Sequence, residues 1–408
     1  MMLNIVLGAG LLTLPGLAAE AAGPSALIVW LVCAAAAAPL LVVFAILGRN
    51  FPDAGGLAAF LKRGFGQTGY TLATFLFLGA VSVGLPAIAL TGGHYAAAAL
   101  GGPPALYAAA LVIGAMLANL ASAETAGRLN AALASIIVLI LGAIAVAGWV
   151  AVQPGWDTLA SSAEEPLGIG VFGATFMMVF FAFTGWEVSA NLGGEFKNPR
   201  RDFPIAMGFS FAVAVALYLG LAVIAVGAGD AGSGPAPFAA IFARDFGPAG
   251  GQVIALVSVL LIFANLSAAI WAVSRMVYSA ATEGLLPKPV ATLKDGVPMR
   301  AVAAVTATLV TVVALAGIEF VELAGLLGAA GLNFLLLYGG AAAALIRLSR
   351  TGGPRLLGWF CVALVAILIA ASGVEALYYP GALILCALLV ASCRASRGTI
   401  PDLRQSSS

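Results

Sequence analysis

Charged residues are scarce in this chain: Asp, Glu, Lys and Arg make up 9% of its 408 residues. A soluble globular domain carries roughly 25% of these four residues, so this chain cannot cover a water-exposed surface of ordinary charge density. The formal net charge is +1, from 18 basic and 17 acidic residues, and there is no basic excess to attract a polyanion. A soluble protein and a nucleic-acid partner are therefore both excluded.

Residue types that ligate metals or perform covalent catalysis are scarce as well. The chain has one histidine and four cysteines, and the cysteines lie far apart in apolar stretches. They are therefore interpreted as packing residues rather than as a disulfide, a redox pair or a metal site. The sequence also lacks a nucleophile–base pair and a phosphate-binding loop, which disfavours a membrane-embedded enzyme. No cofactor is indicated.

Long apolar runs are what the chain has in abundance, since 62% of its residues are hydrophobic. A bilayer span needs about 20 apolar residues. Runs bounded by charges or by Pro/Gly clusters predict twelve spans, with the least certain division around 318–324. We therefore expect an all-α polytopic membrane protein. The expected helices cover residues 2–22, 24–48, 70–99, 104–122, 129–152, 168–192, 205–229, 249–280, 300–317, 322–346, 356–373 and 376–393.

The loop charges predict how these helices are oriented. With a cytoplasmic N-terminus, the inside loops and tail hold 17 of the 18 basic residues, and only Arg244 falls outside. A wrong helix count would scramble this bias from the error onward, so the asymmetry also favours twelve spans. We expect a multi-pass protein of the cytoplasmic (inner) membrane with both termini in the cytoplasm.

Two glycine clusters predict interruptions in the first and sixth helices, at residues 8–16 and 183–187. Glycine costs about 1 kcal/mol in a helix interior and proline about 3 kcal/mol, so both clusters favour local unwinding. Interruptions at matching positions in two halves indicate the substrate site of an inverted-repeat transporter. Opened half-helices offer N–H groups to a carboxylate and carbonyls to an ammonium group, which suits an α-amino acid. The alternative is that both clusters are ordinary glycine-rich faces through which continuous helices pack.

Several motifs at these positions resemble a known family. The first interruption contains Gly8-Ala9-Gly10 and Pro15-Gly16, and the second contains Phe183-x-Gly185-x-Glu187. Together with "GEFKNPRRDFP" (194–204) they are similar to the signatures of the amino acid–polyamine–organocation (APC) superfamily. Within it, "VFAILGRNFPDAGG" (43–56) and "VGLPA" (83–87) resemble the exporters of methionine and branched-chain amino acids.

The resemblance implies a LeuT-like fold of twelve transmembrane helices, with a 5+5 inverted repeat and two additional helices. Residues 1–153 would form the first repeat and 154–346 the second, inverted one. The two accessory helices would cover 347–393 and a short cytoplasmic tail 394–408. Substrate would lie between the two interruptions, with helices 3, 8 and 10 as walls.

The resemblance also implies roles for single residues. Backbone N–H groups would hold the substrate carboxylate, backbone carbonyls would hold its ammonium group, and a tryptophan would line or close the pocket. The residues that would bind the substrate carboxylate are Gly8, Ala9 and Gly10. Those that would bind its ammonium group are Phe183, Thr184 and Gly185, and the tryptophan is Trp186. The chain departs from the family's Gly-Ser/Thr-Gly by having alanine in the middle. It also begins closer to this motif than relatives do, so we expect either an upstream start or a shortened first half-helix.

Glu187 is the most informative polar residue within the expected spans. A carboxylate in the membrane interior is costly, usually faces the protein interior and indicates function. It could couple transport to protons, shape the pocket and contact the substrate amine, or cap a helix. These three alternatives remain open.

The other polar residues within or beside the helices are expected to be structural. Glu195 is expected to fix the exit of the sixth helix, and Arg275 to anchor a helix end or form a gate pair. Buried asparagines such as Asn119 and Asn333 are expected to bond between helices. A sodium site near Ser267 is not favoured, because the nearby sequence supplies no acidic oxygen.

The sequence and the resemblance together predict a secondary transporter of neutral hydrophobic L-amino acids: methionine, leucine, isoleucine and valine. Working by alternating access, it would be an exporter driven by the proton gradient, with the amino acid and the lipid bilayer as its partners. The direction comes only from the resemblance. A proton-coupled importer or an exchanger of the same fold is the alternative, and a transport-like sensor without flux is a third class.

Overall fold

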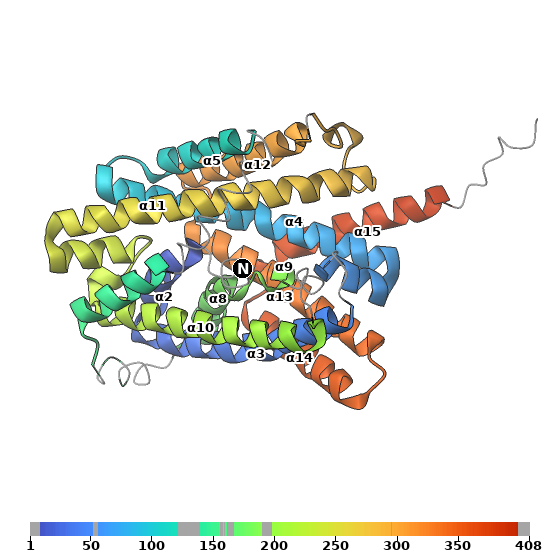
Figure 1. Cartoon of the computed structure of the whole chain (residues 1–408), viewed down its shortest axis with the longest axis horizontal. Helices are drawn as coiled ribbons and strands as arrows, with labels where there is room; N and C mark the ends of the chain where they lie inside the picture. Colours follow the sequence, from blue (N-terminus) through green and yellow to red (C-terminus); the bar gives the residue numbers. More distant parts are fainter. Residues whose placement is uncertain are drawn as a thin grey trace, which may run out of the picture.

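The protein is all-helical, as the apolar runs predict. The computed structural model describes residues 9–51, 56–120, 139–155, 158, 160, 167–189, 198–294 and 296–398. Within these ranges the only β-type pairing is one isolated bridge between Lys294 and Val297. Figure 1 shows long helices lying side by side along the long axis of the molecule, as expected for a bundle that crosses a bilayer.

Eight helical segments of the described residues are long and apolar enough to span a membrane, with mean hydropathies from 1.7 to 2.7. Three shorter apolar helices accompany them, at Pro104–Leu120, Leu139–Val152 and Ile169–Phe183. The chain is therefore a multi-pass membrane protein. Its labelled α-helices are α2 (Leu14–Ala22), α3 (Ala26–Asn50), α4 (Gly56–Leu100), α5 (Pro104–Leu120), α8 (Ile169–Phe180), α9 (Trp186–Ser189), α10 (Pro199–Gly227), α11 (Pro237–Thr282), α12 (Met299–Gly317), α13 (Leu323–Leu348), α14 (Gly352–Ala371) and α15 (Tyr378–Gly398).

Short 3₁₀ helices lie at several ends and interruptions of these helices. Two of them, η1 and η4, lie inside the first and sixth predicted helices, so neither of those helices is continuous. The 3₁₀ helices are η1 (Ala9–Leu12), η2 (Gly23–Ser25), η4 (Phe181–Phe183), η6 (Gly229–Gly232), η7 (Lys288–Val290) and η8 (Glu375–Leu377).

The core of the bundle is formed around α4 and α13. In the most apolar window of each, 67% of the residues are buried inside the protein, against 22% in α14 and 11% in α15. Helix α13 packs against α4, α8 and α14, and α4 also packs against α11, α5 and α15. Two central helices therefore face protein on most sides, whereas α14 and α15 lie at the periphery.

Helices α4 and α11 share an unusual bend near their N-termini. Each begins as a short helix that turns at a glycine with positive φ, Gly66 (φ 68°, ψ −156°) and Gly247 (φ 74°, ψ 175°). The two glycines lie in similar sequences, Phe-Gly-Gln-Thr-Gly and Phe-Gly-Pro-Ala-Gly. Only glycine adopts this backbone conformation without strain. The last glycine of each motif lets the short helix fold back closely, because a side chain there would collide with it.

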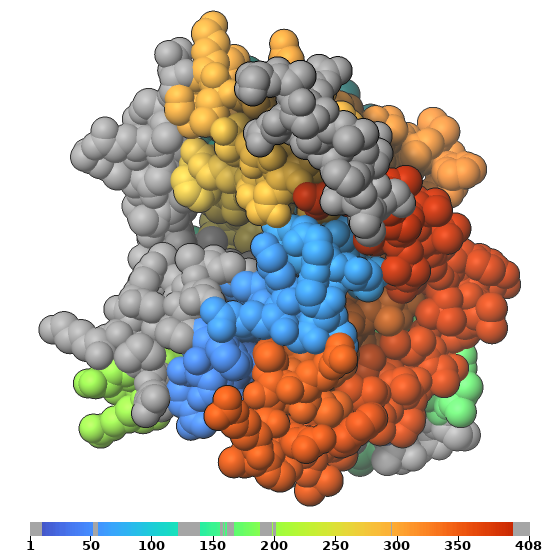
Figure 2. Space-filling view, turned by 90° about the vertical axis from the view of Figure 1, so that its right-hand side faces the viewer, coloured from blue at the N-terminus to red at the C-terminus, as the bar shows by residue number. Residues whose placement is uncertain are grey.

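The loops that are expected to share one side of the membrane meet at one end of the molecule. Arg347 at the end of α13 donates to the Gly64 carbonyl (3.1 Å), and Arg394 at the end of α15 donates to the Glu283 carbonyl (2.6 Å). Figure 2 shows this end, with the start of α4 in blue, the region after α11 in gold and α15 in red. The same-side grouping of these segments agrees with the predicted topology.

Candidate functional site

The first helix is interrupted at Thr13, between η1 and α2. Thr13 has backbone angles of φ −114° and ψ −36°, and its side chain does not cap α2. Instead its hydroxyl donates to the Pro235 carbonyl (2.6 Å). The Tyr95 hydroxyl of α4 donates to the Leu12 carbonyl (2.7 Å), which the interruption has released from helical bonding. No side chain therefore caps the first turn of α2. A carboxylate could bind there, because a site for an anion at a helix N-terminus needs N–H groups that no side chain occupies.

The sixth helix is interrupted between α8 and α9. After η4, Thr184 is extended (φ −95°, ψ 172°) and Gly185 has a φ of 104°. The Tyr218 hydroxyl of α10 donates to the Ala182 carbonyl in η4 (2.7 Å). A side-chain hydroxyl from a neighbouring helix therefore stabilises each interruption.

The two interruptions lie next to each other, with Phe181 between them. Elements η1 and η4 are in contact, and a Cβ placed on Gly10 would lie 3.6 Å from Cδ1 of Phe181. A Cβ on Gly84 of α4 would lie 2.9 Å from the same ring, so a larger residue there would push the Phe181 ring aside. The half-buried Phe181 ring also lies 6.3 Å from the Phe334 ring of α13. Helices α4 and α13, the third and tenth predicted spans, thus enclose the interruptions.

Glu187 is buried at the start of α9, with 4% of its surface exposed. Its Oε2 accepts from the Gly185 N–H (2.9 Å) and from the Tyr338 hydroxyl of α13 (2.6 Å). Among the described residues no lysine or arginine pairs with it. Phe44 and Phe180 lie edge-on to the Tyr338 ring, at 4.7 and 5.9 Å between centroids, and hold it in place. The carboxyl group therefore joins the second half of the interrupted helix to α13.

The predicted substrate-binding residues occupy several kinds of position. Gly8 lies outside the described residues, whereas Ala9 and Gly10 belong to η1. Glu195, the residue predicted to fix the exit of the sixth helix, also lies outside the described residues. Thr184 and Gly185 form the extended link between η4 and α9. The remaining two, Phe183 and Trp186, are each 1% exposed.

Phe183 and Trp186 lie in an aromatic cluster with α3 and α10. The Phe183 ring lies 5.1 Å from Tyr218 and 6.1 Å from Trp30, and the Trp186 ring lies 5.9 Å from Phe211. Their side chains thus pack against α3 and α10, on a different side from the Phe181 ring. Their backbone groups remain at the interruption.

Arg275 lies on α11, and its guanidinium contacts within the described residues are with its own helix. Its guanidinium stacks over the Trp271 ring, 3.7 Å from the centroid, and donates to the Trp271 carbonyl (3.1 Å). In the described part of the chain it has no acidic partner. These contacts anchor the arginine to its own helix.

The buried asparagines Asn119 and Asn333 donate hydrogen bonds to different kinds of partner. Asn119 of α5 donates to the Ser267 carbonyl of α11 (2.9 Å), so the predicted interhelical bond is confirmed there. Asn333 donates to the Ala329 carbonyl of its own helix (2.8 Å). The prediction of an interhelical partner is wrong for the Asn333 amide nitrogen, because it bonds to the carbonyl one turn back in its own helix.

Sequence reasoning missed the three tyrosines, Tyr95, Tyr218 and Tyr338. A buried tyrosine hydroxyl needs a hydrogen-bond acceptor, and an apolar helix interior supplies few. The released carbonyls of the interrupted helices supply them for Tyr95 and Tyr218, and the Glu187 carboxyl group supplies one for Tyr338. An isolated tyrosine in an apolar helix, in a chain with two predicted interruptions, is a signal that could have identified these residues.

Comparison with known proteins assigns the chain to a family. The sequence model described as "Amino acid permease" matches residues 1–385. The uncharacterized amino acid permease YecA of Bacillus subtilis is 29% identical over 392 residues, covering 93% of this chain and 91% of that protein. The L-methionine/branched-chain amino acid exporter YjeH of Escherichia coli is 35% identical over 210 residues, covering 50% of this chain and 48% of the exporter. The putrescine transporter PotE of Escherichia coli is 25% identical over 291 residues, covering 69% of this chain and 66% of PotE.

Proposed function

Because the chain belongs to the amino acid permease family, and is thus a transporter rather than an enzyme, we propose that it is a secondary active transporter of neutral hydrophobic L-amino acids. The observation that carries this proposal is the pair of interrupted helices lying side by side in the membrane. Unwound backbone at membrane depth is stable only inside protein or beside a wet cavity, and it offers both N–H and carbonyl groups.

In the proposed complex the substrate lies beside Gly10, Thr184 and Gly185. The uncapped first turn of α2 and the N–H groups around Gly8, Ala9 and Gly10 hold the carboxylate. Carbonyls of Phe183, Thr184 and Gly185 hold the ammonium group. The substrate side chain lies toward Phe181 and Phe334, whose aromatic rings suit methionine, leucine, isoleucine or valine.

We propose a LeuT-like arrangement of twelve spans, with five helices repeated in inverted order and two accessory helices. The recurrence of the Phe-Gly-x-x-Gly bend at Gly66 and Gly247 supports the repeat, since it precedes the third and the eighth predicted spans. The low burial of α14 and α15 supports their accessory role. Alternating access would then be a movement of one set of helices against the other around the substrate.

Glu187 is the proposed site of proton coupling. Its carboxyl group is buried, has no cationic partner among the described residues and bonds to Gly185 and Tyr338. A carboxylate held in this way is costly to keep charged, so protonation is a means of changing the contact between α9 and α13. Glu195 and Arg275 are proposed to stabilise the cytoplasmic ends rather than to bind substrate, and no sodium ion is required.

Export is the proposed direction, and the likeness to the Escherichia coli exporter supports it over half of the chain. A proton-coupled importer or an exchanger of the same fold is the second candidate. The likeness to PotE, named as a putrescine transporter, does not favour a cationic substrate here. A diamine would need further acidic groups, and Glu187 is the one carboxylate in contact with an interruption in the described part of the chain.

Flux measurements in proteoliposomes test the proposal. Vesicles are loaded with labelled methionine or leucine, and a proton gradient of either sign is imposed. Flux that depends on the sign of the gradient is expected. Flux of neither substrate under either gradient would exclude the proposed function, whereas exchange insensitive to pH would identify an exchanger.

A further inference from the structure

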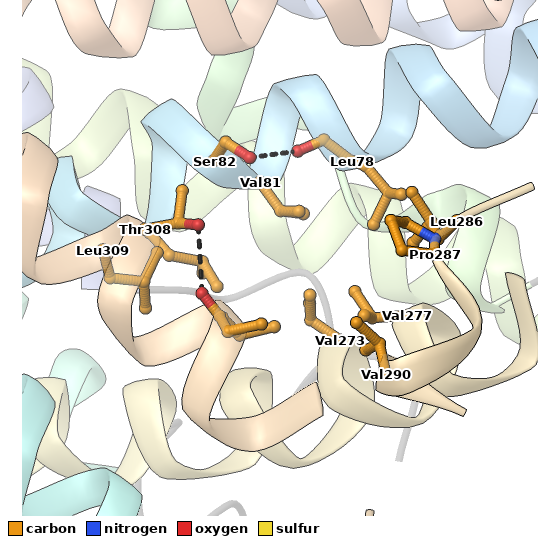
Figure 3. A pocket seen from close by; sticks show the side chains of 13 residues that line it. Leu78, Val81, Ser82, Val273, Val277, Leu286, Pro287, Val290, Thr308 and Leu309 are labelled. Carbon is orange, nitrogen blue, oxygen red and sulfur yellow. Dashed lines mark hydrogen bonds between the residues drawn. The ribbon is translucent and has the colours of Figure 1, made fainter. Parts of the chain in front are cut away.

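A groove of about 240 Å³ opens on the outside of the bundle between α4, α11 and α12, and no residue of the two interruptions lines it. Figure 3 shows its walls, to which Val81, Val273 and Leu309 contribute side chains from the three helices. The turn that contains Leu286, Pro287 and Val290 closes one end of the groove.

The groove lining is almost entirely apolar, and its two hydroxyl groups are already bonded. Ser82 donates to the Leu78 carbonyl (2.7 Å) and Thr308 to the Ala304 carbonyl (3.0 Å), as the dashed lines in Figure 3 show. Neither hydroxyl donor is left for a polar ligand. The groove therefore suits a hydrocarbon chain better than an amino acid.

The medium around the groove is the bilayer, because α4, α11 and α12 are all long and apolar enough to be membrane spans. Ala304 and Thr308 are exposed on the outer face of α12, so the groove is open to that medium. At 240 Å³ it is smaller than the roughly 300–1,000 Å³ of typical small-molecule pockets. One acyl chain is a fitting occupant.

Two cations lie at the end of the groove where α12 begins. Arg300 precedes Ala304 by four residues and so lies on the same face of α12. Its guanidinium donates to the Pro289 carbonyl (3.2 Å), which fixes it beside η7 and the exposed Lys288. The nearest acidic residue to Lys288 in the sequence is Glu283, and the nearest to Arg300 is Asp295, which lies outside the described residues. Arg394 donates to the Glu283 main-chain carbonyl (2.6 Å), so a third cation lies close to Glu283.

We propose that this groove binds one acyl chain of an anionic glycerophospholipid, whose phosphate lies against Lys288 and Arg300. Basic residues at the end of an apolar groove, at the membrane surface, match the two parts of such a lipid. The proposal is independent of the transported substrate, because the groove shares no residue with the interruptions.

Native mass spectrometry of the protein, released from bilayers of equal phosphatidylglycerol and phosphatidylethanolamine, tests this site. The wild type is expected to retain phosphatidylglycerol preferentially. Thr308→Phe fills the groove and should abolish that retention. Thr311→Phe is the matched control, because Thr311 is also exposed on α12 and bonded to its own helix but does not line the groove.

The charge contribution is tested separately with the double variant Lys288→Gln and Arg300→Gln. It should lower phosphatidylglycerol retention by about tenfold relative to the wild type. Arg355→Gln, an exposed arginine of α14, is the control and should have no effect. Equal retention of both lipids by the wild type, or undiminished retention by Thr308→Phe, overturns the proposal. The proposal is also overturned if Thr308→Phe converts a dimer to a monomer while lipid retention is unchanged, because the groove would then be an interface between two copies of the chain.

Discussion

Glu187 and Tyr338 form the contact on which the proposed mechanism depends most. They lie 151 residues apart in the chain, and the 2.6 Å bond between them is buried. The bond joins the second half of an interrupted helix to the central helix α13. In the proposed mechanism, its strength would affect how easily the two elements separate during alternating access.

Replacing Glu187 with Gln should abolish the dependence of flux on the pH gradient while leaving the fold intact. The amide oxygen still accepts from the Gly185 N–H and the Tyr338 hydroxyl, so only the ability to exchange a proton is lost. Flux in proteoliposomes at several imposed pH gradients measures this. Glu375→Gln, at an exposed residue of η8, is the control. A Glu187→Gln protein that keeps its gradient dependence would exclude proton coupling by Glu187 and leave a role in the pocket or in capping.

Replacing Tyr338 with Phe removes a hydroxyl and keeps the ring contacts with Phe44 and Phe180. We expect the free energy of unfolding to fall by about 1–3 kcal/mol, because a buried carboxyl group loses a hydrogen-bond donor. Flux should fall as well. Thermal unfolding in detergent and flux in vesicles provide the two measurements. Tyr107→Phe removes an exposed hydroxyl bond to Gly101, and an equal effect of both variants would refute a special role for Tyr338.

At the scale of helices, sequence periodicity and composition predict most of the elements. The expected helices 24–48, 104–122 and 322–346 correspond to α3, α5 and α13 within a few residues. The uncertain division at 318–324 is correct, since α12 ends at Gly317 and α13 begins at Leu323. The expected helix 129–152 is described only from residue 139 onward.

The site is only partly predictable, for a physical reason. Glycine and proline clusters mark the interruptions because backbone preference is local. The contacts of Tyr95 with Leu12 and of Tyr338 with Glu187 join residues 83 and 151 positions apart. No periodicity along one helix carries that information, because it depends on which helices pack together. The same limit applies to Phe183 and Trp186, whose rings pack against α3 and α10.

Close packing between α8 and α13 depends on glycine at position 331. A Cβ on Gly331 would overlap the main-chain carbonyl oxygen of Met177, and a backbone atom cannot move aside without separating the helices. Gly331→Ala should therefore lower the free energy of unfolding by about 1–3 kcal/mol. Gly325→Ala on the same helix meets nothing within 4 Å and should be neutral or stabilising by up to about 1 kcal/mol. Thermal unfolding of both proteins compares them, and equal stabilities would contradict this packing.

For the whole molecule, the distribution of basic residues predicts which loops face the cytoplasm. Cys33 and Cys361 are buried, so replacing Cys386 and Cys393 with alanine gives a suitable background for labelling. In this background Glu319→Cys should react with a membrane-impermeant maleimide on intact cells. Arg350→Cys should react only after permeabilisation. Both positions are exposed, so accessibility to water does not differ between them. The opposite labelling pattern would invert the proposed topology.

The bends at Gly66 and Gly247 also bear on the ancestry of the chain. If both halves descend from one five-helix unit, they have not kept equal lengths. The first half has 53 residues from the interruption at Thr13 to Gly66, and the second has 63 from Thr184 to Gly247. The connection between α10 and α11, which includes η6, bonds to the first interruption: Thr13 donates to the Pro235 carbonyl, and the Gly234 N–H donates to the Gly16 carbonyl (3.2 Å). If the proposed repeat holds, one copy contributes a connection that braces the other copy's interrupted helix, and neither half would be complete on its own.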